Sequence, residues 1–338
     1  MYENYYRFRQ QPFGPTPDPE FLYRSEVHQE TIEQIARGIK RREGMMLLTG
    51  DVGTGKTTTT RALLQLLDAD VFIASIRNPF VGVLELLRSL LLDFEVVVDG
   101  PELREAGTTN LIEILSRFLV SLDSVKGSAL VVVDEAQNLS PPVIEQLRVL
   151  TTLETDQRKL LQILLVGQPE LEVLLAEPKM SSVNQRIARR CRLRPLYRDE
   201  LDQYVDFRLR TAKGTAEPLF TSRALDLVHG YSRGVPRRIN QLCDRALEEG
   251  YLSLTTEITE SLIHEAANAL GLSCRRENVN EVTPRKDLEV RPVRRWSRIL
   301  FWIGVLTVLC LVMFGVGVAM EFLPPLTFSF QILPWTKG

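Results

Sequence analysis

The sequence has 338 residues, of which 44% are hydrophobic, and a formal net charge of −2. This length and apolar content can fill the cores of two compact domains, and the balanced charge provides no overall field that would point to nucleic acid or an acidic partner. The four cysteines are widely scattered along the chain: Cys191, Cys243, Cys274 and Cys310. Their spacing excludes a disulfide framework and a zinc site, and it predicts reduced thiols in a cytoplasmic body.

Residues 1–40 are predicted to form an N-terminal segment and a first helix. The first eleven residues are aromatic and polar, without the apolar run of a signal peptide. Four prolines between Pro12 and Pro19 predict extended, turn-like chain as far as Phe21. Isoleucines at helical spacing then predict a helix over residues 25–41.

Residues 41–197 alternate short apolar runs with helical patterns. Strands are predicted at residues 45–49, 71–76, 129–133, 161–166 and 191–196, and helices at 56–67, 81–92 and 110–122. Strands separated by helices indicate a parallel sheet with right-handed crossovers. The predicted fold class of this region is therefore α/β.

After Pro195 the pattern becomes entirely helical. Four amphipathic helices are predicted at residues 199–212, 222–231, 236–252 and 260–270. We interpret residues 198–272 as a small all-α domain, followed by a basic hydrophilic linker over residues 273–298 whose end would lie against anionic headgroups.

Residues 299–320 contain no charged side chain. At 1.5 Å per residue this apolar run spans a hydrocarbon core of about 30 Å, which predicts a transmembrane helix. Arginines precede the run, and an excess of arginine marks the cytoplasmic side. The sequence thus predicts a single-pass protein of the bacterial inner membrane, with its N-terminal body in the cytoplasm and a short periplasmic tail over residues 321–338.

A glycine-rich stretch after the first predicted strand fits the pattern G-x-x-x-x-G-K-[ST] in full. Glycines let backbone N–H groups turn towards phosphates, and the helix that follows adds its positive dipole end. In this pattern Lys56 reaches the β- and γ-phosphates, and the Thr57 hydroxyl binds Mg²⁺. The predicted nucleotide-binding residues are Gly50, Asp51, Val52, Gly53, Thr54, Gly55, Lys56, Thr57 and Thr58.

Two acidic residues follow the apolar strand at 129–133. A parallel strand brings Asp134 to the edge of the sheet where ligands bind, so Asp134 and Thr57 are predicted as the magnesium ligands. Glu135 is placed to polarise water towards the γ-phosphate. The predicted cofactors are therefore ATP and Mg²⁺, and the predicted activity is hydrolysis of ATP to ADP and phosphate.

Further motifs carry a family resemblance over residues 2–270: Pro12-Phe13, Thr16-Pro17-Asp18-Pro19, Phe21-Leu22-Tyr23, Gly50 to Thr57, Asp134-Glu135-Ala136-Gln137, Leu153-Glu154-Thr155-Asp156, Leu165 to Leu171, Gln185-Arg186-Ile187 and Gly234-Val235-Pro236-Arg237. With these residues the chain resembles the ExeA/GspA group of AAA+ ATPases, which includes MshM-like pilus-biogenesis proteins. The resemblance implies an AAA+ P-loop fold in which a nucleotide lies between the sheet domain and a helical lid.

The resemblance also implies roles for single residues and a shared site in homo-oligomers, with a ring as one form. Gln168 would sense the γ-phosphate, and Arg237 would be the second sensor that closes the lid. The arginine reaching a neighbour's γ-phosphate would be Arg186, Arg189 or Arg190, with Arg186 favoured and Arg190 next. The predicted catalytic set is Glu135, Lys56, Arg186, Arg190, Gln168 and Arg237.

By resemblance the ATPase would assemble or remodel an inner-membrane secretion, pilus or export complex, with a GspB-like protein as a candidate partner. Only 18 residues follow Met320, so we expect no C-terminal peptidoglycan-binding domain. Three alternatives stay open: a TniB-like DNA-handling ATPase of transposition, a nucleotide-gated scaffold without turnover, and an ATPase of polysaccharide export or protein sorting. The membrane span and the mild charge argue against nucleic acid as the partner.

Overall fold

The computed structural model describes residues 2–14, 19–76, 78–155, 158–212 and 219–272. The contacts of the chain divide it into two units, residues 1–276 and 277–338, and the elements below all belong to the first. The predicted linker, membrane helix and periplasmic tail (273–298, 299–320 and 321–338) lie outside the described residues, as does most of the 16–19 motif.

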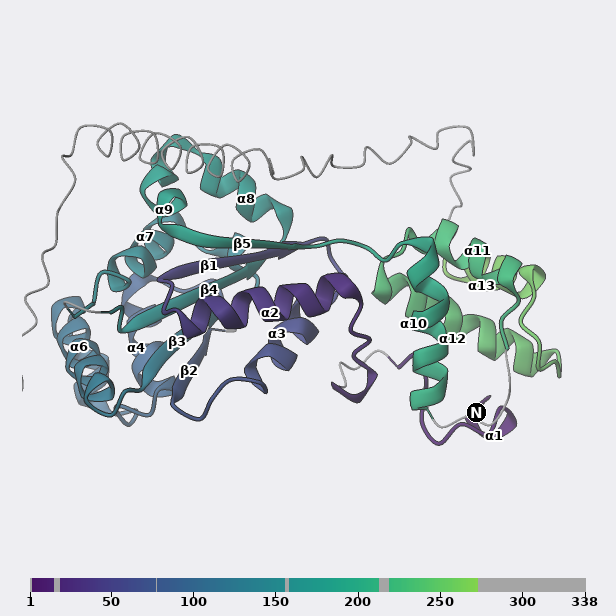
Figure 1. Ribbon diagram of the computed structural model, residues 1–338, viewed down its shortest axis with the longest axis horizontal. Helices are drawn as coiled ribbons and strands as arrows, with labels where there is room; N and C mark the ends of the chain where they lie inside the picture. Colours follow the sequence, from purple (N-terminus) through teal and green to yellow (C-terminus); the bar gives the residue numbers. More distant parts are fainter. Residues whose placement is uncertain (1, 15–18, 77, 156–157, 213–218, 273–338) are drawn as a thin grey trace, which may run out of the picture. The chain divides into compact units, whose positions relative to one another are not determined.

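A parallel sheet of five strands forms the body that holds the site (Figure 1). Its strand order is β2-β3-β4-β1-β5, with the bounds β1 Met45–Gly50, β2 Val71–Ile76, β3 Ser128–Val133, β4 Leu161–Gly167 and β5 Ile187–Leu193. The three inner strands β3, β4 and β1 are buried over their whole length because helices cover both faces. The predicted α/β class and the parallel sheet are confirmed.

Alternate residues of the inner strands pack on opposite faces of the sheet. Leu47 of β1 faces the larger apolar cluster, whereas Leu48 faces the smaller one. The larger cluster is covered mainly by α4 Val83–Asp93, α6 Thr108–Ser124, α7 Pro141–Leu150, α8 Pro169–Ala176 and α9 Ser181–Arg186, with the short α5 Pro101–Glu105 beside them. The smaller cluster is covered by α2 Glu26–Lys40 and α3 Lys56–Leu64.

Strand β5 differs from its prediction. It spans Ile187–Leu193 rather than residues 191–196, because Ile187 already pairs with Met45 of β1. β5 is one of the two edge strands of the sheet, and its alternate residues Ala188, Arg190 and Arg192 are exposed. The two arginines removed the apolar pattern by which the other strands were predicted. The helices α7, α8 and α9 were not predicted either.

A third apolar cluster joins four helices to the N-terminal aromatic residues. The helices are α10 Arg198–Thr211, α11 Ser222–Ser232, α12 Pro236–Leu252 and α13 Glu260–Ala269, each within one residue of its prediction. The chain before α2 is not simply extended, because α1 Tyr2–Tyr5 and the 3-10 turn Pro19–Phe21 are helical. The Tyr6 hydroxyl donates to the Thr255 carbonyl at 3.1 Å, which ties this segment to the helices. The boundaries drawn at residues 40, 197 and 272 stay a proposal.

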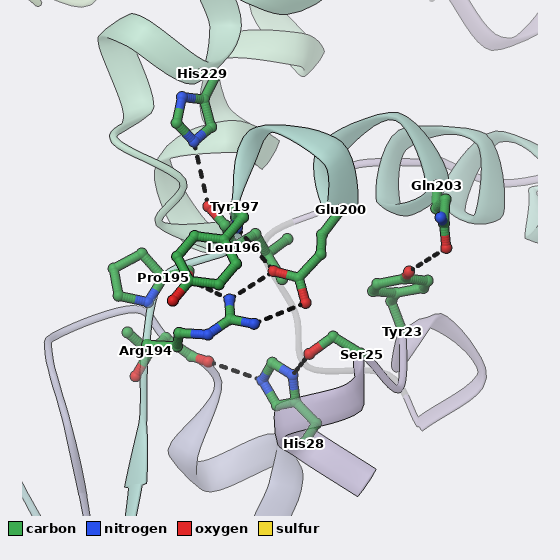
Figure 2. A network of polar contacts seen from close by, with 11 residues as sticks. Tyr23, Ser25, His28, Arg194, Pro195, Leu196, Tyr197, Glu200, Gln203 and His229 are labelled. Carbon is green, nitrogen blue, oxygen red and sulfur yellow. Dashed lines mark hydrogen bonds and ion pairs between the residues drawn. The ribbon is translucent and has the colours of Figure 1, made fainter. Parts of the chain in front are cut away.

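The connection from β5 to α10 is held against the turn that precedes α12. The Leu196 N–H donates to the Gly234 carbonyl at 2.8 Å, and His229 Nε2 lies 3.2 Å from the Leu196 carbonyl oxygen (Figure 2). Gly234 has φ +71°, and a Cβ there would lie 2.0 Å from the Leu196 oxygen. Glycine is therefore required at this position both by conformation and by space.

We expect Gly234→Ala to lower the melting temperature more than Gly271→Ala does. Gly271 is the matched control, because its φ is +64° but a Cβ there would meet no atom of the described residues within 4 Å. The left-handed conformation alone costs alanine about 1–2 kcal/mol, and only Gly234 adds the collision with Leu196. Thermal unfolding followed by circular dichroism measures both variants, and equal losses would contradict this role of Gly234.

Among the described residues, no helix is both long enough and apolar enough to cross a membrane. The longest, α6 and α12, have 17 residues each and carry polar side chains on one face, whereas a span needs about 20 predominantly apolar residues. This finding contradicts the prediction that the protein lies in the bacterial inner membrane, and that prediction is wrong. The predicted span itself, residues 299–320, lies outside the described part of the chain.

Candidate nucleotide-binding site

The turn between β1 and α3 has the backbone that a phosphate-binding loop needs. Gly53 has φ +82° and Gly55 has φ +97°, values that side-chain-bearing residues rarely adopt. Gly55 is also the N-cap of α3 and offers no side-chain acceptor to the first N–H groups of that helix. These donors are therefore available to an anion at the positive end of the helix.

Lys56 points its ammonium group back into the loop. The side chain is only 6% exposed, and Nζ donates to the carbonyls of Gly50 at 2.8 Å and Asp51 at 3.1 Å. Burial lowers the pKa of Lys56 below its ordinary value, although the charges of Glu135 and Asp134 oppose this shift. No ion pair of Lys56 occurs within the described residues, so its charge is free to meet a phosphate.

Strand β3 brings Asp134 next to the start of α3. The Thr57 hydroxyl donates to Asp134 Oδ2 at 3.0 Å, and Asp134 Oδ1 accepts from the Glu135 N–H at 2.9 Å. Mg²⁺ takes oxygen ligands at about 2.0–2.1 Å in octahedral geometry, which puts neighbouring ligands about 2.9 Å apart. The Thr57 and Asp134 oxygens therefore fit a magnesium ion.

A magnesium site beside a bound nucleotide needs few protein ligands. Within the part of the chain that the structure describes, no group of three or more His, Cys, Asp or Glu side chains could hold a metal ion. Mg²⁺ is usually bound through one or two carboxylates together with substrate phosphates and waters, rather than by a protein cage.

Two glutamines hold the Glu135 carboxylate. Gln137 and Gln168 donate from their Nε2 atoms to Glu135 Oε2 at 2.6 and 3.2 Å, and Gln137 Oε1 in turn accepts from the Gln168 N–H at 3.0 Å. Burial acts to raise the pKa of Glu135, but these hydrogen bonds and the charge of Lys56 outweigh it, so the pKa lies below its ordinary value. The carboxylate is therefore ionised and fixed in direction.

A cavity of about 570 Å³ opens beside the loop and is bordered by three parts of the chain. They are the loop itself with Glu135, the N-terminal aromatic residues around Phe21, and the helices α10 and α12. Arg237, the second residue of α12, borders the cavity, and its N–H donates to the Gly53 carbonyl at 3.2 Å. This volume is of the size that small-molecule and cofactor sites have.

The structure gathers most of the predicted site residues around this cavity but not the candidate finger arginines. The cavity is bordered by residues 52–58 of the predicted loop, by Glu135 and by Arg237. Four predicted residues do not border it: Gly50, Asp51, Asp134 and Gln168. Asp134 is instead hydrogen-bonded to Thr57, and Gln168, the N-cap of α8, to Glu135. Arg186 ends α9 and Arg190 lies in β5, and neither borders the cavity. Arg189 instead forms an ion pair with Glu43 at 2.6 Å.

Two residues at the site were not assigned a role from the sequence. Gln137 stands two positions after Glu135 in the motif Asp134-Glu135-Ala136-Gln137, which carries the family resemblance. This short spacing is the one sequence feature that could have placed its amide near the Glu135 carboxylate. His28, which contacts the loop, lies within a predicted amphipathic helix. Nothing in the local pattern distinguished it from an ordinary buried histidine.

Comparison with known proteins identifies the family. Residues 39–175 match the AAA domain family. Over 267 residues, or 79% of its length, the chain is 41% identical to General secretion pathway protein A of Aeromonas hydrophila. The chain is an AAA+ protein related to General secretion pathway protein A. The predicted resemblance to the ExeA/GspA group is thus confirmed, although the chain spans about half (48%) of that relative.

Solved structures share the fold of this AAA+ protein. The ORC2 protein of Aeropyrum pernix in its ADPNP–ADP complexes matches with a TM-score of 0.57 at 18% identity, over 77% of this chain and 71% of that one. Cdc6p of Pyrobaculum aerophilum matches with a TM-score of 0.58 at 18% identity, over 76% and 70% of the two chains. At this identity the likeness establishes the fold alone, which is the predicted P-loop AAA+ fold.

Proposed function

We propose that this AAA+ protein binds Mg-ATP at the Gly50–Thr57 loop, hydrolyses it to ADP and phosphate, and uses the cycle to assemble or remodel a secretion, pilus or export complex. The observation that carries the hydrolytic proposal is the fixed, ionised Glu135 carboxylate beside Lys56. A protein that only sensed nucleotide would not need a carboxylate held by two amides at this position. The secretion role is supported by the relation to General secretion pathway protein A.

Each residue of the loop has a task set by its position. The N–H groups at the start of α3 and the Lys56 ammonium bind the phosphates, while Thr57 and Asp134 would hold Mg²⁺. When bound, Mg²⁺ supplies positive charge that neutralises the phosphate oxygens as they lose the γ-phosphoryl group. Glu135 orients a water molecule and accepts its proton, and Gln168 keeps that carboxylate in place.

The arginine that completes a neighbour's site is proposed to be Arg186. Its side chain is exposed at the end of α9, and among the described residues it forms no hydrogen bond or ion pair that would restrain it. Arg190 is less free, because its Nη2 donates to the Asn184 carbonyl at 3.1 Å. A guanidinium that must reach another subunit has to be unrestrained within its own.

We expect Arg186→Ala to lower ATP turnover by about 10³-fold or more without weakening ATP binding, whereas Arg190→Ala leaves turnover almost unchanged. Phosphate release by the full chain measures turnover, and titration with a fluorescent ATP analogue measures binding. Mixing inactive Arg186→Ala with inactive Glu135→Gln should restore activity, because the second variant supplies Arg186 to the intact site of the first. Failure of the mixture to recover would contradict a shared site.

Phosphate release also tests the proposal as a whole. The purified chain with Mg-ATP should release phosphate steadily, and its partner in a secretion complex should be retained better with ATP than with ADP. Tight binding of ATP without phosphate release would instead support a nucleotide-gated scaffold. Salt-sensitive binding of DNA by the full chain, a property not expected here, would support the transposition-type alternative.

A further inference from the structure

His28 has no place in the chemistry above, yet it contacts the phosphate-binding loop directly. It lies in the first turn of α2 and is only 4% exposed. Its Nε2 lies 3.1 Å from the Thr54 carbonyl oxygen. Its Nδ1 lies 2.6 Å from the Ser25 hydroxyl (Figure 2). Both ring nitrogens are therefore engaged, although the ring borders the cavity.

These contacts determine the tautomer of the ring. The Thr54 carbonyl can only accept, so Nε2 carries the hydrogen, and Nδ1 of the neutral ring accepts from the Ser25 hydroxyl. Ser25 is the N-cap of α2, but its side chain does not cap the helix and is left for His28. Burial holds the pKa of His28 below its ordinary value, and Arg194 adds to the shift while the Thr54 carbonyl and Glu200 oppose it. The ring is therefore neutral near pH 7.

The hydrogen bond to Thr54 fixes the direction of the next N–H group. In a planar trans peptide the C=O and the following N–H point in opposite directions. The Thr54 carbonyl is drawn towards α2, so the Gly55 N–H must point away from α2. Gly55 has φ +97°, and a Cβ there would lie 3.2 Å from His28 Nε2, so the ring also packs against this peptide unit.

The peptide unit needs an outside restraint because the residue that follows it is a glycine. Gly55 has a positive φ and carries no Cβ to limit rotation about this peptide unit. If this unit turned over, a carbonyl oxygen would replace the Gly55 N–H and repel a phosphate. The restraint comes from a buried ring, which Ser25 holds from one side while the ion pair of Arg194 with Glu200 lies close by (Figure 2).

We propose that His28 is a positioning residue that holds the Thr54–Gly55 peptide so that the Gly55 N–H faces the phosphates. This inference rests on the proposed function, because it assigns the loop to phosphate binding. It predicts that losing the Nε2 donor weakens the contribution of the phosphates to affinity and leaves that of the nucleoside unchanged.

Three variants of the full chain test the inference. Gln places its amide nitrogen near the position of Nε2, whereas Asn reaches only the position of Nδ1 and Leu provides no donor. Displacement of a fluorescent ADP analogue by ADP and by AMP gives the gain in affinity from the β-phosphate. We expect His28→Asn and His28→Leu to reduce this gain about tenfold, His28→Gln to keep it within about twofold, and AMP to bind all three equally.

The results distinguish this inference from the proposed function. If the wild-type chain binds ADP no better than AMP, the proposed function fails and this inference fails with it. If the wild-type shows the gain and His28→Asn keeps it in full, only the role of His28 is refuted. If a variant does not fold, the tautomer of His28 in the wild-type chain still tests the inference. Nitrogen-15 spectra should show His28 with its hydrogen on Nε2, and a hydrogen on Nδ1 alone would overturn the proposal.

Discussion

Lys56→Ala should bind ATP at least about 100-fold more weakly than the wild-type chain. The ammonium of Lys56 is buried in the loop, and among the described residues it is hydrogen-bonded to the carbonyls of Gly50 and Asp51 and to no carboxylate. A phosphate therefore meets a cation without a competing anion from this part of the chain. Each hydrogen bond between charged groups contributes about 1.5–3 kcal/mol. Lys56 has three N–H donors, so it forms two such bonds, to the β- and γ-phosphates, once one donor leaves a loop carbonyl, and these two bonds account for the loss. Isothermal titration with Mg-ATP measures it directly.

Lys40→Ala is the matched control for this variant. Lys40 is exposed at the end of α2, so its removal takes away the same formal charge without touching the site. We expect it to bind Mg-ATP as the wild-type does. The melting temperature of Lys56→Ala must also be recorded, because the Gly50 and Asp51 carbonyls lose their donor. ATP binding at wild-type strength by a folded Lys56→Ala variant would remove the loop from the proposed site.

Glu135→Gln should keep ATP binding and lose turnover by about 10²–10⁴-fold. Glutamine has the shape of glutamate and one oxygen that can still accept from Gln137 or Gln168, so the local structure is preserved. It cannot accept the proton of the attacking water. Single-turnover phosphate release measures the chemical step, while titration with Mg-ATP measures the retained affinity.

Glu177→Gln serves as the control for Glu135→Gln. Glu177 follows α8 and forms a surface ion pair with Lys179 at 2.8 Å, so its replacement should change neither binding nor turnover. The outcome that contradicts the assignment is normal phosphate release by Glu135→Gln. Another carboxylate would then have to act as the base. The hydrogen bonds from Gln137 and Gln168 to Glu135 would then stabilise the fold without a role in hydrolysis.

The fold could be predicted wherever one physical signal dominated. β1, β3 and β4 are buried on both faces, so they appear as continuous apolar runs and were placed to within one residue. β5 was misplaced because an edge strand keeps only every second residue buried, and arginines fill the exposed positions. The N-terminal aromatic segment was expected to be extended because its prolines were visible, whereas its burial against α12 depends on contacts 240 or more residues apart along the chain.

The residues of the candidate site likewise fall into those that a local motif predicts and those that it does not. Gly53, Gly55, Lys56 and Thr57 were predicted because a local pattern prescribes both the turn and its ligand. Gln137 and His28 act on the site through hydrogen bonds to Glu135 and Thr54, which a sequence motif does not specify. The predicted membrane location was wrong for a different reason. It rested on the apolar run at residues 299–320, outside the described part of the chain, and no described helix is long and apolar enough to cross a membrane.

The most direct test of the account is the position of the nucleotide in a crystal of the full-length Glu135→Gln variant grown with Mg-ATP. The β-phosphate should lie within hydrogen-bond distance of the Gly55 and Lys56 N–H groups and the Lys56 ammonium. Magnesium should lie beside Thr57 and Asp134, with the γ-phosphate facing residue 135. A nucleotide bound elsewhere, or a loop that holds no phosphate at saturating Mg-ATP, would contradict the central claim.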